Sequence, residues 1–195
     1  PQFADAWYNL GNATPPGESI IVNEQEYTQQ QLYVEALKHD PQHVSAWGNL
    51  GAGTAPGDTI NVNGQEYTDQ QLYMEALKHD AQDAFSWGNL ANGIAAGASI
   101  NVNGQDLTKQ QLYVEALTHD PQDAYAWYNL GSATSRDESV TVNGQEYTEQ
   151  QLFVMTLTLD PQFADAWHNL GNATPAGESI SVNGTLYTKE ACLKL

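Results

Sequence analysis

The chain has little of the chemistry that builds many functional sites. Of its 195 residues, one is cysteine and two are methionine. A single cysteine excludes a disulfide within the chain and a zinc site built from cysteines. Lysine and arginine together number 6 against 24 aspartate and glutamate residues, which gives a formal net charge of -18. Such a charge repels phosphate backbones and anionic lipid, so we expect neither nucleic acid nor a membrane as a partner.

Long apolar runs are also missing, and no charged segment followed by an apolar one marks a leader. The longest apolar runs fall far short of the ~20 residues that cross a bilayer. We expect a soluble chain, and among compartments the sequence favours the cytoplasm. Because the first residue is Pro1 rather than Met, an earlier processing step is compatible with the sequence.

Motifs for catalysis are lacking as well. The sequence contains no Gly-rich phosphate loop of the nucleotide-binding or dinucleotide-binding type. Cys192, the one candidate thiol nucleophile, lies in the terminal segment with no base assigned to it. We expect no enzymatic activity and no cofactor.

What the chain does contain is a repeat of forty residues. Tryptophan stands at positions 7, 47, 87, 127 and 167, and each copy opens the phrase Trp-x-Asn-Leu followed by Gly or Ala. A fixed period of this length is typical of a solenoid, in which each unit buries its apolar face against its neighbours. We predict a single repeat domain over 1–195, with repeats at 1–40, 41–80, 81–120, 121–160 and 161–195.

Each repeat is predicted to begin with a helix. In the second repeat, Asp40-Pro41 offers an N-cap followed by a proline at the first helical position, so the helix should start there. Trp47, Leu50 and Gly51 then form an apolar stripe with helical spacing. A cluster of glycine and proline ends the helix.

A β-hairpin should follow. Residues 59–68 alternate apolar and polar around Asn63-Gly64, the dipeptide most typical of a type I′ turn. In the first repeat, Glu24 replaces this glycine at a position that needs positive φ, which should cost about 1 kcal/mol. We expect the first hairpin to be looser or differently turned.

The alternation also fixes the register of the two strands. Ile60 should lie opposite Tyr67 on a buried face, and Asn61 opposite Glu66 on a solvated face. Neighbouring helical repeats are roughly 8–10 Å apart and two strands occupy nearly the same width. A further hypothesis is therefore that successive hairpins pair into one continuous edge sheet. The acidic residues of the solvated face would then form a row of Glu26, Glu66, Asp106 and Glu146.

A second helix is predicted after each hairpin. Thr68-Asp69-Gln70-Gln71 has the form of a capping box, and the helix that it starts should run to about His79. The same box recurs at Thr28, Thr108 and Thr148.

The two predicted helices resemble those of the tetratricopeptide (TPR) repeat, whose pattern runs W-x2-L-G-x2-Y, then A-x3-F, then a final P. Residues 7–11 match the first helix and residues 33–41 match the end of the second. Two signature positions differ, at Thr14 and Gln29. About six residues lie between them in excess of the 34-residue TPR unit, and they correspond to the hairpin. The resemblance implies a mainly helical α/β solenoid, a right-handed stack of helix, β-hairpin and helix.

In TPR proteins the first helices line a concave groove that holds an extended peptide. The resemblance assigns ligand contacts to positions two before the tryptophan and one, two and five after it. From these positions the predicted groove residues are Asp5, Tyr8, Asn9, Asn12, Ser45, Asn49, Phe85, Asn89, Asn92, Tyr125, Tyr128, Asn129, Asp165, His168, Asn169 and Asn172.

Amide and aromatic side chains at these positions can bond a peptide backbone and bury apolar side chains. No lysine or arginine occurs among them, so we expect a neutral or basic peptide rather than an acidic carboxylate. The asparagines could equally bridge one helix to the next. The alternative function is structural: a spacer, or an array that associates with itself end to end or along an edge.

A second recurring column carries His39, His79 and His119. Ligands of one metal ion lie about 2.1 Å from it, whereas equivalent residues of neighbouring repeats are a whole repeat spacing apart. We therefore expect no metal there and interpret these histidines as partners of helix C-termini.

Overall fold

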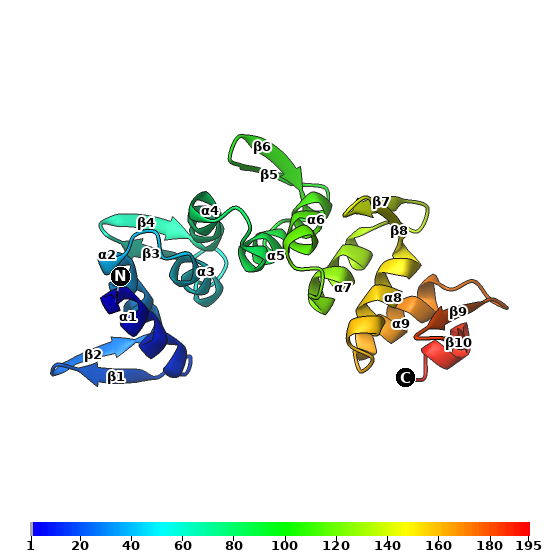
Figure 1. The fold of residues 1–195 in the computed structure, drawn as a ribbon, viewed down its shortest axis with the longest axis horizontal. Helices are drawn as coiled ribbons and strands as arrows, with labels where there is room; N and C mark the ends of the chain where they lie inside the picture. The colour runs from blue at the N-terminus through cyan, green and yellow to red at the C-terminus, as the bar shows by residue number, and fades with distance from the viewer. Residues whose placement is uncertain (1) are drawn as a thin grey trace. The chain divides into compact units, whose positions relative to one another are not determined.

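The structure is a computed structural model that describes residues 2–195, and it consists of repeated helix, hairpin and helix units (Figure 1). The first helices are α1 (Gln2–Ala13), α3 (Val44–Gly53), α5 (Ala84–Asn92), α7 (Ala124–Ala133) and α9 (Ala164–Ala173). The second helices are α2 (Gln29–His39), α4 (Asp69–His79), α6 (Lys109–His119), α8 (Glu149–Leu159) and α10 (Lys189–Cys192). The hairpins pair β1 (Ser19–Val22) with β2 (Gln25–Thr28), β3 (Thr59–Val62) with β4 (Gln65–Thr68), β5 (Ser99–Val102) with β6 (Gln105–Thr108), β7 (Ser139–Val142) with β8 (Gln145–Thr148), and β9 (Ser179–Val182) with β10 (Thr185–Thr188). The TPR-like array of 40-residue repeats predicted from the sequence is confirmed.

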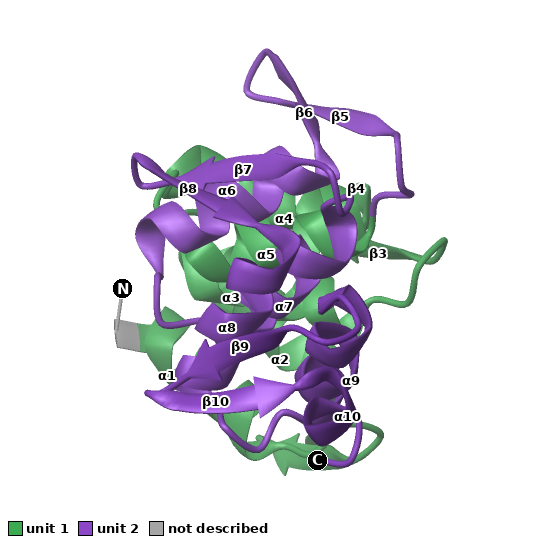
Figure 2. Cartoon of the chain, turned by 90° about the vertical axis from the view of Figure 1, so that its right-hand side faces the viewer, with its two compact units in different colours: residues 1–93 green, residues 94–195 purple. Residues whose placement is uncertain are grey.

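The repeats fall into two compact units, residues 1–93 and residues 94–195 (Figure 2). The boundary follows α5, inside the third repeat. In the second repeat, the Thr54 hydroxyl donates to the Leu50 carbonyl at 2.8 Å, but Ile94 at the equivalent place has no hydroxyl. The prediction of one domain over 1–195 concerns how the two units associate, and it stays a prediction.

Neighbouring helices pack side by side within each unit, and glycine lets them approach closely. A Cβ atom placed on Gly51 of α3 would lie 2.8 Å from Cε1 of Tyr73 on α4, which is too close for a carbon contact. The Tyr73 ring therefore covers bare backbone and is itself buried, which raises the pKa of Tyr73 to about 12. Leu50, Leu72 and Ala76 complete the contact without any exposed surface.

The first helix of the second repeat begins at Val44, so the start predicted at Asp40-Pro41 is wrong. The Asp40 carboxylate accepts from the Gln42 N–H at 3.0 Å, and this local turn competes with the helix. His43 is the N-cap, with Nδ1 accepting from the Ala46 N–H at 3.2 Å. The corresponding caps in later repeats are Asp83 and Asp123.

The hairpin register is the predicted one. Ile60 pairs with Tyr67, and Asn61 pairs with Glu66. The Tyr67 ring meets the Trp47 ring edge to face at 5.2 Å, so the inner face of the hairpin covers the tryptophan of the first helix. Asn61 and Glu66 are exposed, as expected for the solvated face.

The first hairpin keeps the same turn, so the prediction of a looser or different one is wrong. Asn23 and Glu24 adopt φ of 49° and 68°, close to the 52° and 89° of Asn63 and Gly64. Val22 still pairs with Gln25 across the turn. Strand pairing and packing thus hold Glu24 in a left-handed conformation that its side chain disfavours.

The hypothesis of one continuous edge sheet is contradicted. Each hairpin forms its own two-stranded sheet, and within the two units of the described chain no hairpin pairs with the next one. The reason is that β3 lies against α2, where the Asn63 side chain donates to the Leu37 carbonyl at 3.5 Å. Each such hairpin therefore contacts the second helix of the preceding repeat instead of the preceding hairpin. The acidic residues at Glu26, Glu66, Asp106 and Glu146 therefore sit on separate hairpins, not on one sheet.

The second helices start with the predicted capping boxes. At Thr68 the hydroxyl accepts from the Gln71 N–H, and the Gln71 side chain accepts from the Thr68 N–H. Gln70, between them, reaches the next repeat, where its amide donates to the Gly93 carbonyl at 3.0 Å. The same boxes begin the second helices at Thr28, Thr108 and Thr148.

Replacing Glu24 by glycine should stabilise the chain by about 1 kcal/mol, because glycine adopts positive φ without the steric cost borne by glutamate. Urea unfolding followed by circular dichroism measures the change. The matched control is Gly64→Glu, which should destabilise by a similar amount. A neutral or destabilising effect of Glu24→Gly would show that the turn stores no such cost.

Candidate functional site

The predicted contact residues all lie on the first helices, and they are exposed or half-buried. The surface that they form on α1, α3 and α5 in one unit, and on α7 and α9 in the other, is called the first-helix face below. The exposed residues are Asp5, Asn9, Asn12, Ser45, Phe85, Asn92, Tyr125, Asp165, His168 and Asn172. The half-buried residues are Tyr8, Asn49, Asn89, Tyr128, Asn129 and Asn169.

In the first unit, three of these residues meet in one hydrogen-bonded cluster. The Asn49 amide of α3 donates to Tyr8 Oη at 3.3 Å and to Asn12 Oδ1 at 3.1 Å, both on α1. Tyr33 of α2 donates from its hydroxyl to the same Asn12 oxygen at 2.9 Å. Burial raises the pKa of Tyr33, which keeps this hydroxyl protonated as the donor. The cluster joins three helices of two repeats.

Aromatic and charged groups extend the cluster. The Tyr8 ring lies 4.7 Å from the His43 ring and 5.8 Å from the Tyr33 ring, measured between centroids. His43 Nδ1 accepts from the Ala46 N–H, and its other ring nitrogen, Nε2, lies 3.4 Å from a carboxylate oxygen of Asp5. The predicted residues Asp5 and Tyr8 are thus connected through a histidine at the N-cap of the next helix.

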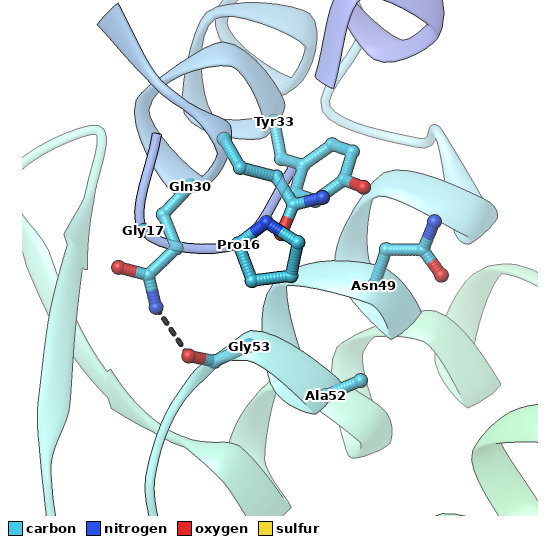
Figure 3. Close-up of a pocket in the computed structure, with 8 residues that line it drawn as sticks. Pro16, Gly17, Gln30, Tyr33, Asn49, Ala52 and Gly53 are labelled. Carbon is cyan, nitrogen blue, oxygen red and sulfur yellow. Dashed lines mark hydrogen bonds between the residues drawn. The ribbon is translucent and has the colours of Figure 1, made fainter. Parts of the chain in front are cut away.

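A cavity of about 570 Å³ opens beside this cluster (Figure 3). We call it the amide pocket. Figure 3 shows Gln30 and Asn49 on opposite sides of it, with Gln30 bonded to the Gly53 carbonyl. Ala52, on the first helix, contributes only a methyl group. The pocket is lined by Pro16, Gly17, Gln29, Gln30, Tyr33, Asn49, Ala52 and Gly53.

The pocket walls combine amide groups with small apolar surfaces. The Gln29 amide nitrogen donates to the carbonyls of Gly11 and Thr14, at 3.2 and 2.9 Å, so its orientation is fixed. An Asn or Gln side chain has two donors and one acceptor oxygen, and part of that capacity stays available to a ligand. Such a site suits the alternating donors and acceptors of an extended peptide backbone.

The second unit assembles a more aromatic version of this face. Phe163 stacks on Tyr128 at 4.8 Å and meets Tyr125 edge to face at 5.0 Å. The Asn169 amide donates to Tyr128 Oη at 3.3 Å, as Asn49 does to Tyr8. Tyr125 is 67% exposed, so its ring presents an open apolar surface.

Phe85, Asn89 and Asn172 make contacts of other kinds. Phe85 fills the space beside Gly48, where an added Cβ atom would lie 3.3 Å from its ring. The Asn89 amide donates to the Phe85 carbonyl of its own helix at 2.9 Å. Asn172 makes its contact through its backbone: its carbonyl accepts a hydrogen bond from the Arg136 side chain at 3.0 Å.

Sequence reasoning missed Tyr33, His43 and Phe163. The last two stand at the N-cap of the first helix, whose column contains aromatic, histidine and aspartate residues in different repeats. That variation was a readable signal, because a purely structural cap favours Asp, Asn, Ser or Thr. Asn49 and Asn169 bridge one helix to the next, which is the packing role left open for the asparagine column.

One buried carboxylate oxygen at the start of a second helix makes no hydrogen bond. Glu149 starts α8 at the position that Gln29 occupies in the first repeat. Its Oε2 atom is buried without a hydrogen bond, and the nearest cation is Arg136, with Nε at 3.8 Å. Burial raises the pKa of the Glu149 carboxyl, and the Arg136 charge opposes this with a smaller effect.

No protein-family model matches the chain, and no curated protein matches it. In the part of the chain that the structure describes, no helix has the length and apolar character needed to cross a bilayer. Among residues 2–195, no three His, Cys, Asp or Glu side chains come together as a metal site requires.

Replacing Glu149 by glutamine should stabilise the chain by about 1 kcal/mol at neutral pH, because an amide can donate to the carbonyl groups at the end of the first helix, as Gln29 does. Urea unfolding measures the change. The substitution also removes the ion pair with Arg136, but this pair contributes little to stability because Arg136 is exposed.

The same substitution should change the pH dependence of stability. Because folding raises the pKa of Glu149, the folded chain binds this proton more tightly than the unfolded chain. The stability that Glu149 contributes through this proton is complete below the usual carboxyl pKa, and it is lost as the pH rises through the raised pKa of the folded chain. Glu149→Gln should remove that loss. An unchanged pH profile of the unfolding free energy would contradict this account of Glu149.

Proposed function

We propose that this chain is a non-catalytic interaction scaffold whose first-helix face binds an extended peptide of neutral or basic character. The observation that carries the proposal is the amide pocket, which lies between the first two repeats and whose walls offer oriented amides beside small apolar side chains. A peptide running along the first helices would meet Asn49 and Gln30 there. The exposed ring of Phe85 supplies an apolar contact on another first helix of the same unit.

Charge supports the choice of peptide. The chain has a formal net charge of -18, and the carboxylates of Asp5 and Asp165 lie on first helices. A negative field attracts a basic partner and speeds its encounter, and added salt screens the attraction. No step of the proposal requires a cofactor, a metal or a chemical reaction.

The experiment that tests the proposal blocks the amide pocket without removing any contact of the fold. Ala52 lines the pocket with a methyl group and is exposed, so Ala52→Arg should place a long side chain into the space that the peptide occupies. Peptides are first selected from a random display library at low salt, and the affinity of the best one is then measured by calorimetry. We expect Ala52→Arg to weaken binding about tenfold or more, as loss of a central contact does.

The matched control is Ala176→Arg in the fifth repeat. It adds the same charge at an exposed loop position, and the fourth repeat carries Arg136 at the equivalent place. Binding should survive this change and should weaken with added salt if the selected peptide is basic. If no peptide is selected, or if Ala52→Arg binds as tightly as Ala176→Arg, the first-helix proposal is wrong.

Self-association is a second candidate function, and the hairpins favour it. Ile21 is 76% exposed on β1 and Leu186 is 72% exposed on β10. The equivalent positions elsewhere carry polar residues, such as Asn61 and Glu66. Exposed apolar side chains beside the open edges of two-stranded sheets are suited to pairing with another copy of the chain.

If the chain associates through these hairpins, its mean mass in solution should rise with concentration. The double variant Ile21→Asn, Leu186→Glu introduces residues that the chain itself uses at the same positions, and it should remain monomeric. Light scattering over a dilution series measures both. A mass that does not change with concentration, or one that the variant leaves unchanged, would argue against association through the hairpins.

A further inference from the structure

Four of the hairpin turns carry an asparagine followed by glycine, which is the dipeptide most prone to deamidation. In this reaction the glycine backbone nitrogen attacks Cγ of the asparagine. The Cγ–N bond forms, the bond from Cγ to Nδ2 breaks, and ammonia leaves with the proton of the glycine amide. Water then opens the cyclic imide to aspartate or isoaspartate. The four turns are Asn63-Gly64, Asn103-Gly104, Asn143-Gly144 and Asn183-Gly184.

The turns share their backbone conformation. The four asparagines have φ between 49° and 52°, and each glycine also has positive φ. Strand pairing continues on both sides of every turn in the same register. Differences in reactivity therefore come from the side chains around each turn rather than from its backbone.

The attacking nitrogen is held in two of the turns and not in the other two. The Gly64 N–H donates to Asn61 Oδ1 at 3.0 Å, and the Gly104 N–H donates to Asn101 Oδ1 at 3.1 Å. In the fourth and fifth repeats the equivalent positions carry Thr141 and Ser181. For Gly144 and Gly184 the described structure contains no side-chain acceptor of the amide proton.

We propose that Asn143 and Asn183 are the deamidation sites of the folded chain, and that Asn61 and Asn101 protect the turns of the second and third repeats. The glycine nitrogen becomes nucleophilic as it loses its proton. An amide oxygen that accepts this proton stabilises the unreactive form and keeps the nitrogen from moving toward Cγ. A hydroxyl side chain at the same position leaves the nitrogen free to react.

The first repeat is protected in a different way. Glu24 follows Asn23, and a side chain on the attacking residue crowds the approach to Cγ. This offers a reason for a residue that the backbone disfavours, because glycine at position 24 would create an Asn-Gly turn. Ile21, at the position of Asn61, has no oxygen to protect it.

Deamidation at these sites would act on the contact between repeats. The Asn143 amide donates to the Leu117 carbonyl at 3.3 Å, and the Asn183 amide donates to the Leu157 carbonyl at 3.4 Å. Both carbonyls belong to the last turn of a second helix. A carboxylate in place of the amide would lose the donor and bring negative charge to the negative end of the helix dipole. The modification would therefore detach a hairpin tip from the preceding repeat.

The test is incubation of the intact chain in mildly alkaline buffer in heavy-oxygen water, followed by proteolysis and mass spectrometry of the four turns. Incorporation of the heavy oxygen identifies deamidation that occurred during incubation. We expect Asn143 and Asn183 to react roughly fivefold faster than Asn63 and Asn103, the factor that one hydrogen bond supplies. Equal rates, or faster reaction at Asn63 and Asn103, would overturn the proposal.

Two matched variants exchange the protecting group. Asn61→Thr should raise the rate at Asn63 by the same factor, and Thr141→Asn should lower the rate at Asn143. Asn63 and Asn143 are the best pair to compare, because both amides also bond to a helix carbonyl of the preceding repeat. Circular dichroism identifies any variant that fails to fold, and the rates of the unmodified chain then decide the question.

Unfolded chain provides the remaining control. In concentrated urea the side-chain acceptors are lost, so the four turns should react at similar rates. If Asn143 and Asn183 stayed faster in urea by the same factor, the difference would belong to neighbouring residues in the sequence, and the proposed protection by Asn61 and Asn101 would be wrong.

Discussion

The last carbonyl groups of a helix have no partner inside that helix, and this chain satisfies many of them with side chains from a neighbouring segment. Gln70 donates across to Gly93 at the end of the next first helix, and Gln110 does the same for Ala133 at 2.9 Å. In the other direction, Asn143 of a hairpin tip donates back to the end of the preceding second helix. Repeats are therefore joined by oriented amides as well as by apolar contact, and each amide fixes the register of one repeat against the next. The same requirement explains why Glu149 is a poor residue for its position, since an ionised carboxylate can only accept.

The first-helix face shows how a repeated framework becomes locally different. Where the residue after the tryptophan is tyrosine, as at Tyr8 and Tyr128, its ring packs against the N-cap residue of the next repeat. An asparagine of that repeat donates to its hydroxyl. Where it is glycine, as at Gly48, a phenylalanine from the next first helix fills the space. The framework accepts either arrangement because both place an aromatic ring between two first helices. Variation on this face therefore changes what a partner would meet without changing how the helices pack.

Much of the fold could be predicted because each local signal agreed with the others. Capping boxes, the Asn-Gly turns and the alternation along the strands all point to the same elements, and a 40-residue period repeats the evidence. The start of the first helix could not be read correctly, because an aspartate followed by proline fits both a helix N-terminus and the turn that Asp40 forms with Gln42. The edge sheet failed because repeat spacing says how far apart two hairpins are and not what lies between them. On the candidate site, the column rule borrowed from TPR proteins located Tyr8 and Asn49. It could not supply Tyr33, which comes from a second helix, or His43, which reaches the face because the helix begins late.

Reciprocal amide contacts with a fixed period have an evolutionary consequence. Residues 1–23 and 161–183 differ at three positions, 8/168, 16/176 and 21/181. Recombination between these two stretches would add or remove four whole repeats, because they are 160 residues apart. The same kinds of glutamine and asparagine contact would form again at the new junction, whereas a shift that is not a whole number of repeats would leave helix ends without donors. The array can therefore change its length only by whole repeats, and its length can change without altering the side chains that a partner would contact.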